Sequence, residues 1–299
     1  MSMADGSRNF IATWASPMIE PLQSDDAFLN DVAAHRDAPG FRLWSLGQSG
    51  FLLQWQGKHL LFDPYLSDSL TKKYASTDKP HVRMTRRVIA PERLGFIDIV
   101  TSSHNHTDHL DAETLNPLRA ANPNLQFVIP EANRTFVAQR LGCPADLPIG
   151  LNDGDMMQLG DFEFHAVASA HESLDRDAEG LCPYLGYVVR FGTWAVYHPG
   201  DTIRHHGMAD KLRPFRIDVA LLPISGRSPE RRVPGNLDGR EAAELSRDIG
   251  AKVTIPCHYE MFAFNTTTPA LFVETCNALG VKARVLRAGE RFDSVVLAE

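Results

Sequence analysis

The sequence contains no apolar run approaching the roughly 18 residues that a membrane-spanning helix needs. Residues 1–8 are small and polar, and no apolar core long enough for a signal peptide follows them. Basic residues are not in excess either, because 30 Lys and Arg stand against 37 Asp and Glu, for a formal charge of −7. A surface that binds nucleic-acid phosphates usually shows a basic excess. We therefore expect a cytoplasmic protein that neither spans a membrane nor binds nucleic acid.

Cysteine is also scarce. The 299 residues include only four cysteines, which are widely spaced and form no CxxC pair. This excludes a disulfide framework and a zinc site built on cysteine, and it favours a reducing compartment. The composition, 43% hydrophobic and 22% charged, is ample for a large core. The chain is therefore of a size and composition typical of a globular enzyme.

Residue types that bind metals are concentrated in the segment His104-Asn105-His106-Thr107-Asp108-His109, which comes shortly after the apolar run at 96–100. Neutral imidazole and carboxylate hold zinc, iron or manganese, and four such side chains gain little from proximity unless a cation orders them. If the segment is extended, His104 and His106 point the same way and Asp108 continues the row. One short loop could then serve two cations. The alternative is a solvated polar loop rich in histidine.

The rest of the chain predicts a β-rich α+β domain. Residues 1–40 are interpreted as an N-terminal extension with a helix at 26–35, acting as a cover, and residues 41–299 as the domain itself. Residues 67–95 are polar and punctuated by proline, as is typical of a lid or binding loop. Strands are predicted at 41–46, 51–55, 59–62, 97–102, 126–129, 156–159, 162–168, 184–191, 193–197, 219–223, 252–256 and 283–286, and further helices at 111–121, 131–141, 239–249 and 269–279. This pattern predicts two packed sheets with helices on their outer faces.

Three further candidate ligands follow predicted strands. His171 comes after the strand at 162–168, Asp201 after that at 193–197, and His258 after that at 252–256. The end of a rigid strand positions a side chain well, although a single histidine at such a place is more often structural. Pro199-Gly200 before Asp201 permits a sharp turn, and the two oxygens of a carboxylate can bridge two cations.

Together these motifs resemble the metallo-β-lactamase-fold hydrolases, and within them the L-ascorbate-6-phosphate lactonase group. The resemblance rests on the HxHxDH of 104–109, on Leu61-Phe62-Asp63-Pro64 and on the segments 197–202, 217–223 and 252–259, and it covers about 41–292. It implies an αββα four-layer sandwich with two metal ions in a cleft. Carried over by position, the first metal is held by His104, His106 and His171, the second by Asp108, His109 and His258, and Asp201 bridges them.

The resemblance also implies a metal-dependent hydrolase in which a bridging hydroxide cleaves a lactone or ester, including that of a phosphorylated small molecule. Two divalent ions are expected, with zinc first and manganese or iron left open. Asp108 would be catalytic, orienting the hydroxide and helping to carry a proton. The passage Ala170-His171-Glu172-Ser173 departs from the lactonase pattern and supplies the more general superfamily ligand. The same set resembles the N-acylphosphatidylethanolamine phospholipase D branch, so a phosphodiesterase is the alternative.

Several other residues keep two interpretations. Asp63 either accepts the distal N–H of a ligand imidazole or only forms a turn before Pro64. A further set of basic and aromatic residues either reaches the substrate or has an ordinary surface or packing role. These are Arg227, Arg231, Arg232, His205, His206 and Tyr259, and, in the long early loop, Lys72, Lys73, His81, Arg86 and Arg87. We expect a small-molecule substrate and leave open whether it is anionic and whether the chain forms a homo-oligomer.

Overall fold

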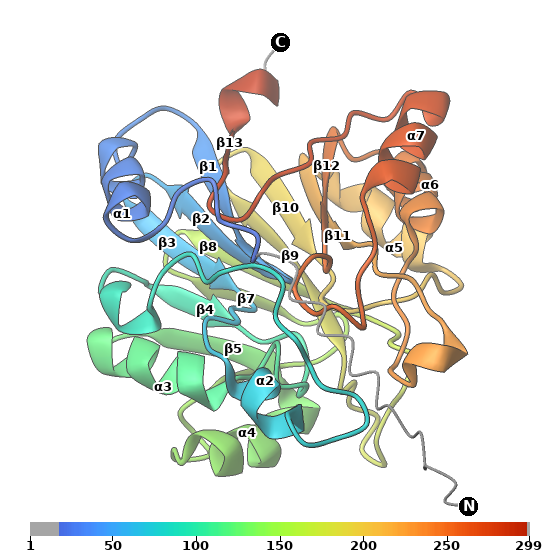
Figure 1. Ribbon diagram of the computed structural model, residues 1–299. Helices are drawn as coiled ribbons and strands as arrows, with labels where there is room; N and C mark the ends of the chain where they lie inside the picture. Colours follow the sequence, from blue (N-terminus) through green and yellow to red (C-terminus); the bar gives the residue numbers. More distant parts are fainter. Residues whose placement is uncertain (1–17, 298–299) are drawn as a thin grey trace, which may run out of the picture.

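Two β-sheets form the middle of the computed structural model, which describes residues 18–297 (Figure 1). The first sheet has the order β13-β1-β2-β3-β4-β5-β6, with β1 (Phe41–Gly47), β2 (Gly50–Trp55), β3 (Lys58–Phe62), β4 (Ile99–Thr101), β5 (Gln126–Pro130), β6 (Ile149–Leu151) and β13 (Arg291–Asp293). The second has the order β12-β11-β10-β9-β8-β7, with β7 (Met156–Leu159), β8 (Phe162–Ala168), β9 (Leu185–Phe191), β10 (Trp194–His198), β11 (Val219–Pro223) and β12 (Val253–Cys257). Each sheet is antiparallel in its first strands and parallel from β3 to β6 and from β10 to β12.

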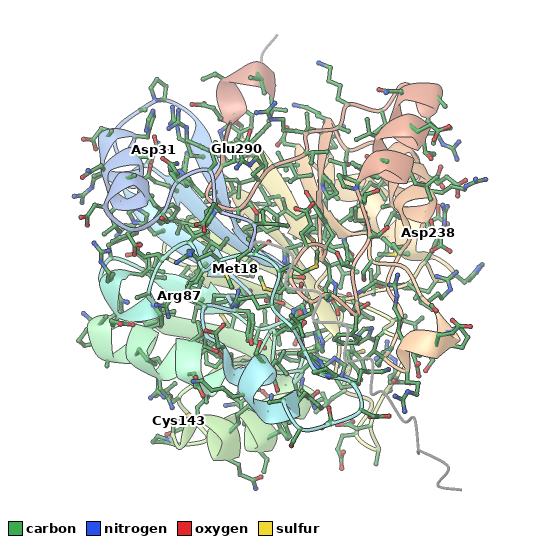
Figure 2. All side chains as sticks on the ribbon, viewed as in Figure 1. Met18, Asp31, Arg87, Cys143, Asp238 and Glu290 are labelled. Carbon is green, nitrogen blue, oxygen red and sulfur yellow. The ribbon has the colours of Figure 1, made fainter. Side chains whose placement is uncertain are left out.

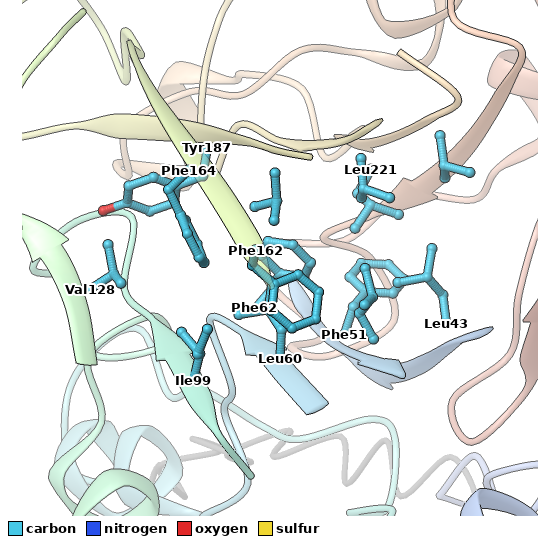
Figure 3. Close-up of a cluster of buried hydrophobic side chains, with 14 of the residues drawn as sticks. Leu43, Phe51, Leu60, Phe62, Ile99, Val128, Phe162, Phe164, Tyr187 and Leu221 are labelled. Atoms are coloured by element: carbon cyan, nitrogen blue, oxygen red, sulfur yellow. The ribbon is translucent and has the colours of Figure 1, made fainter. Parts of the chain in front are cut away.

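The space between the sheets is the main core. Alternate residues of β1, such as Phe41 and Leu43, belong to one buried cluster with residues of the other sheet. The rings of Phe41 and Phe191 lie 5.3 Å apart across it. Figure 3 shows this cluster, with Phe51 and Phe62 of the first sheet opposite Phe162 and Phe164 of the second. The two sheets are therefore fixed face to face by aromatic and branched side chains.

Helices cover both outer faces (Figure 1). The helices are α1 (Asp25–Ala34), α2 (Ser69–Tyr74), α3 (Ala112–Ala121), α4 (Arg134–Leu141), α5 (Met208–Leu212), α6 (Gly239–Ile249) and α7 (Ala270–Leu279), with 3-10 turns η1 (Pro91–Arg93), η2 (Glu131–Asn133), η3 (Arg213–Phe215), η4 (Pro229–Arg231) and η5 (Ser294–Leu297). Side chains of α1, α3 and α4 pack on the first sheet, and those of α5, α6 and α7 on the second. The predicted αββα sandwich is confirmed. Among the helices of residues 18–297, none combines the length and apolar character of a membrane-crossing segment.

The N-terminal part of the chain packs on the first sheet through α1. Phe28 and Val32 are buried against Trp44, and Asp31, labelled in Figure 2, accepts a hydrogen bond from Trp44 Nε1 at 2.8 Å. A covering role for the helix agrees with these contacts, while the domain boundary at residue 41 stays a prediction. Residues 1–17 of the predicted extension lie outside the described residues.

The prediction of a strand at 283–286 was wrong. Ala283 makes only an isolated bridge with Thr254, and the chain joins the first sheet later, where Leu43 pairs with Phe292 of β13. The 67–95 segment contains α2, and β6 and α5 were not predicted. These elements are three to six residues long, too short to show a period of 2 or 3.6.

Candidate metal centre

Seven side chains converge at one edge of the sandwich, and we call them the floor: His104, His106, Asp108, His109, His171, Asp201 and His258. Their ligand-type atoms form three compact groups, namely His104 with His106 and His171, His104 with His109 and Asp201, and Asp108 with His109 and His258. The first four residues follow β4, and the other three follow β8, β10 and β12 of the opposite sheet. Both sheets are therefore needed to assemble the floor.

The loop after β4 is a turn, so the extended conformation considered from the sequence is wrong. The N–H groups of His109 and Leu110 both donate to the carbonyl of His106, at 3.1 and 2.8 Å. This turn, which leads to the Asp111 cap of α3, brings the rings of His104 and His109 to a centroid distance of 4.1 Å. All four side chains consequently face the same site.

Asp201 reaches the middle of the floor through the turn that follows β10. Gly200 there has φ +65°, and a Cβ on it would lie 2.2 Å from Ser103 Oγ, so only glycine lets the two sheets approach so closely. The carboxylate lies 3.3 Å from His109 Nε2, 3.4 Å from His171 Nε2 and 3.1 Å from His258 Nε2. Asp201 thus lies close to one imidazole of the His104, His106 and His171 group and to two of the Asp108, His109 and His258 group.

Hydrogen bonds behind the floor fix which nitrogen faces it. His171 Nδ1 donates to the carbonyl of Gly235 at 2.9 Å, which leaves His171 Nε2 facing His106 Nδ1 at 3.2 Å. Such a bond to the distal nitrogen selects the tautomer whose other nitrogen can bind a metal.

Asp63 does the same for His109 and is also a turn former. Its Oδ2 accepts from His109 Nδ1 at 2.8 Å, while its Oδ1 accepts from Thr101 Oγ1 at 2.8 Å and from the N–H of Ser103 at 3.1 Å. The side chain is fully buried. Burial would raise the pKa of this carboxyl, but the bond from His109 and the nearby imidazoles outweigh it and lower the pKa. Asp63 therefore accepts the distal N–H of His109, and the interpretation that it only forms a turn is wrong.

The imidazoles of the floor differ in pKa, according to their burial and the charges beside them. Burial lowers the pKa of His106 to about 4, with a neighbouring imidazole adding to the shift, and burial also lowers the pKa of His104 well below its usual range. Burial would also lower the pKa of His258, but Asp201 and Asp108 outweigh it and raise that pKa to about 9. A cation bound among these groups would replace the proton that the two carboxylates favour on His258.

The donor atoms fit divalent cations. His104 Nε2, His109 Nε2 and one oxygen of Asp201 are buried and have no hydrogen-bond partner among the described residues. Unpaired buried polar atoms are rare because each loses its hydration without compensation. Here they face one another, and mixed imidazole and carboxylate donors are those that zinc, manganese and iron accept.

Above the floor opens a cavity of about 490 Å³, whose upper wall we call the mouth. The mouth comprises Lys73, Tyr74, His81, Phe136, Arg140, Arg232, Phe262 and Phe264. Its rings pack together, since His81 lies at centroid distances of 4.1 Å from Tyr74 and 4.3 Å from Phe264. The mouth therefore offers both positive charge and apolar area.

The remaining candidates divide between the cavity and other places. Lys73, His81 and Arg232 line the cavity. The others make contacts elsewhere: Lys72 with Glu113, Arg86 with Glu20, Arg87 with the Leu66 carbonyl, Arg227 with Glu241, Arg231 with the Ser225 and Thr266 carbonyls, His205 with the His206 and Ala168 carbonyls, and Tyr259 with the Leu286 carbonyl. His206 is not among the lining residues either.

Sequence reasoning missed Gln48, which lines the cavity from the turn between β1 and β2. Its Nε2 donates to Asp108 Oδ2 at 2.7 Å and lies 3.0 Å from His258 Nε2. The only local signal is the sequence Gly47-Gln48-Ser49-Gly50, which predicts a turn and nothing about chemistry.

Residues 42–258 match the beta-lactamase superfamily domain. The chain belongs to this superfamily. A UPF0173 metal-dependent hydrolase of Rubrobacter xylanophilus is 27% identical over 266 residues, covering 85% of this chain and 97% of the relative. A probable L-ascorbate-6-phosphate lactonase of Escherichia coli is 25% identical, covering 79% of this chain and 75% of the relative.

Solved structures also share the fold. The isothiocyanate hydrolase from Delia radicum gut bacteria superposes with a TM-score of 0.66 at 20% identity, covering 84% of this chain and 98% of that one. The protein is thus a metal-dependent hydrolase of the metallo-β-lactamase superfamily. Its activity requires divalent metal ions, for which the floor contains the candidate ligand groups.

Proposed function

We propose that the floor holds two divalent cations, zinc first among them. His104, His106 and His171 would hold the first, Asp108, His109 and His258 the second, and Asp201 would lie between them. Support comes from the compact groups that these atoms form, from the unpartnered nitrogens that face inward, and from the carboxylate placed within 3.4 Å of three imidazoles. The last of these observations carries the proposal.

Cations bound there would supply an activated water and polarise the oxygen of the bond to be cleaved. The chain itself aims the donor nitrogens, through Asp63 behind His109 and the Gly235 carbonyl behind His171. Asp108, which lines the cavity, would orient the attacking water and carry a proton to the leaving oxygen. Hydrolysis of a lactone or ester needs these roles and no further cofactor.

We further propose that the substrate is a small anionic molecule carrying a lactone or ester, such as a phosphorylated one. Lys73, Arg140 and Arg232 put positive charge around the entrance, while Tyr74 and Phe264 can cover the body of the substrate. A relative described as a probable L-ascorbate-6-phosphate lactonase supports this choice. All four cysteines are free thiols, which supports a cytoplasmic setting.

The test is metal analysis of the purified protein together with turnover of a panel of phosphorylated and neutral lactones, esters and phosphodiesters. We expect two bound divalent ions per chain and cleavage of lactones or esters, with the anionic members preferred. Cleavage of phosphodiesters alone would replace this proposal with a phosphodiesterase. The basic side chains of the mouth would suit a phosphodiester substrate as well. One bound ion per chain would contradict the two-cation arrangement.

A further inference from the structure

Gln48 is held under backbone strain at the edge of the floor. It has φ +52°, as is usual in a two-residue hairpin turn such as that between Gly47 and Gly50, and this conformation costs a non-glycine residue energy. Its carbonyl accepts the N–H of His258 at 2.8 Å, and the next carbonyl, of Ser49, accepts from His198 Nε2 at 2.8 Å. The turn between β1 and β2 is therefore fastened to two places on the opposite sheet, and its position relative to the floor is set.

The side chain of Gln48 is buried, with 4% of its surface exposed, although it lines the cavity. Its Nε2 donates to Asp108 Oδ2 at 2.7 Å. That oxygen is the one that faces the other members of its group, since it lies 3.6 Å from His258 Nε2 and 3.7 Å from His109 Nε2. Gln48 therefore acts on the ligand-facing oxygen of Asp108.

The orientation of the amide follows from charge. A carboxylate oxygen accepts hydrogen bonds and repels another oxygen, so the NH₂ end of the amide must face Asp108. The bond is charge-assisted, and such bonds are shorter and stronger than those between neutral groups. Asp108 is the only residue of its group supplying an oxygen, and it begins no helix or strand that would fix its side chain. The amide supplies this fixation.

We propose that Gln48 is a positioning residue for the second cation, acting through Asp108. The inference rests on the proposed function. Gln48 makes no hydrogen bond to His104, His106 or His171. Instead, Ser103 Oγ contacts His104 Nδ1, and the Gly235 carbonyl accepts from His171 Nδ1. The effect of Gln48 is therefore confined to one of the two cation positions, which distinguishes it from a general structural role.

The experiment is a titration of chelator-treated protein with Zn²⁺ by calorimetry and with Co²⁺ by absorption, on the wild type, Gln48→Ala and Gln48→Glu. In Gln48→Ala we expect the affinity of the second ion to fall by roughly 10- to 100-fold, as is typical when a supporting partner of a ligand is lost, with the first ion unchanged. Gln48→Glu has nearly the same volume but no donor, and its carboxylate repels Asp108, so its loss should be at least as large.

Gln158→Ala is the matched control, because this exposed glutamine on β7 donates only to the Gly160 carbonyl, and both affinities should be unchanged. Thermal melting of the metal-free proteins checks folding, and if Gln48→Ala is unstable, Gln48→Glu alone decides. Tighter binding of the second ion in Gln48→Glu would overturn the proposal, since it would make residue 48 a ligand. Equal losses at both positions, or none, would also overturn it. A wild type that binds only one ion would instead refute the proposed function, independently of these variants.

Discussion

The floor and the mouth of the same cavity are built in different ways. Floor residues follow strands that are buried in the sandwich, and three of them, His104, His109 and His171, are held from behind by Ser103, Asp63 and the Gly235 carbonyl. Mouth residues come from the 67–95 segment, α4 and the loops around residues 232 and 264. The ion pair between Arg232 and Asp78 is exposed, whereas Arg140 donates to the Asn105 carbonyl in a partly buried bond. The contacts of the floor are thus mainly buried, and those of the mouth are more exposed.

This difference separates two tasks. A buried hydrogen bond to a charged group is costly to break, whereas an exposed ion pair contributes little and is screened by salt. The floor can therefore maintain the precise geometry that metal chemistry requires. The mouth can change between relatives without harm to the fold, so we expect it to determine which substrate is bound.

The largest expected effect is that of His104→Ala in the floor. This histidine belongs to two of the three ligand groups, so its loss should abolish hydrolysis and remove at least one bound ion. His205→Ala is the control, because His205 contacts only main-chain carbonyls and does not line the cavity. Metal content and turnover are measured on both. Equal losses in the two variants would mean that the floor has no special role.

The next effect is that of Asp63→Asn, which keeps the shape but removes the charge behind His109. We expect the metal affinity to fall by roughly 10- to 100-fold, and the free energy of unfolding by about 1–3 kcal/mol, because buried donors lose a charged acceptor. Metal titration and denaturant unfolding measure the two losses. Asp161→Asn, in the exposed turn between β7 and β8, should change neither. An unchanged metal affinity in Asp63→Asn would show that the bond from His109 to Asp63 does not support metal binding.

The contrast between floor and mouth also explains what the sequence could predict. His104, His171, Asp201 and His258 each follow a strand whose apolar pattern is evident, and the motif at 104–109 is compact enough to indicate metal binding without any tertiary information. The helix predicted at 239–249 is confirmed, and the structure has a capping box at Asp238, directly before it.

What could not be predicted depends on contacts between distant segments. Gln48 looks like an ordinary turn residue and gains its role only because the second sheet places Asp108 and His258 beside it. The strand Arg291–Asp293 is too short to show alternation and forms because the edge of β1 offers it a partner. The mouth is formed by loops that carry no periodic signal, so its lining residues could be considered only as alternatives.

A smaller effect is expected from Lys73→Ala or Arg232→Ala in the mouth. Either change removes a positively charged side chain from the entrance. KM for an anionic substrate should therefore rise a few-fold, while kcat and the metal content stay the same. Lys72→Ala is the matched control, because the Lys72 ammonium pairs with Glu113 and Lys72 does not line the cavity. Steady-state kinetics at low and high salt measure the difference. A loss of kcat at constant KM would show that Lys73 and Arg232 act in the chemical step and not in substrate binding.

The smallest effect is expected from Asp78→Asn, which releases Arg232 from its exposed partner. KM for an anionic substrate should fall slightly, because the guanidinium becomes free to bind it, and the melting temperature should not change. A marked loss of stability would show that the mouth is held as firmly as the floor.

The central claim is that two cations share the floor, with Asp201 between them. Its most direct test is the number of metal ions bound per chain in Asp201→Ala, measured by elemental analysis beside the wild type and with turnover on the same samples. The account predicts two ions and hydrolysis in the wild type, and loss of bound metal and of turnover in the variant. Full metal occupancy and full turnover in Asp201→Ala would contradict it.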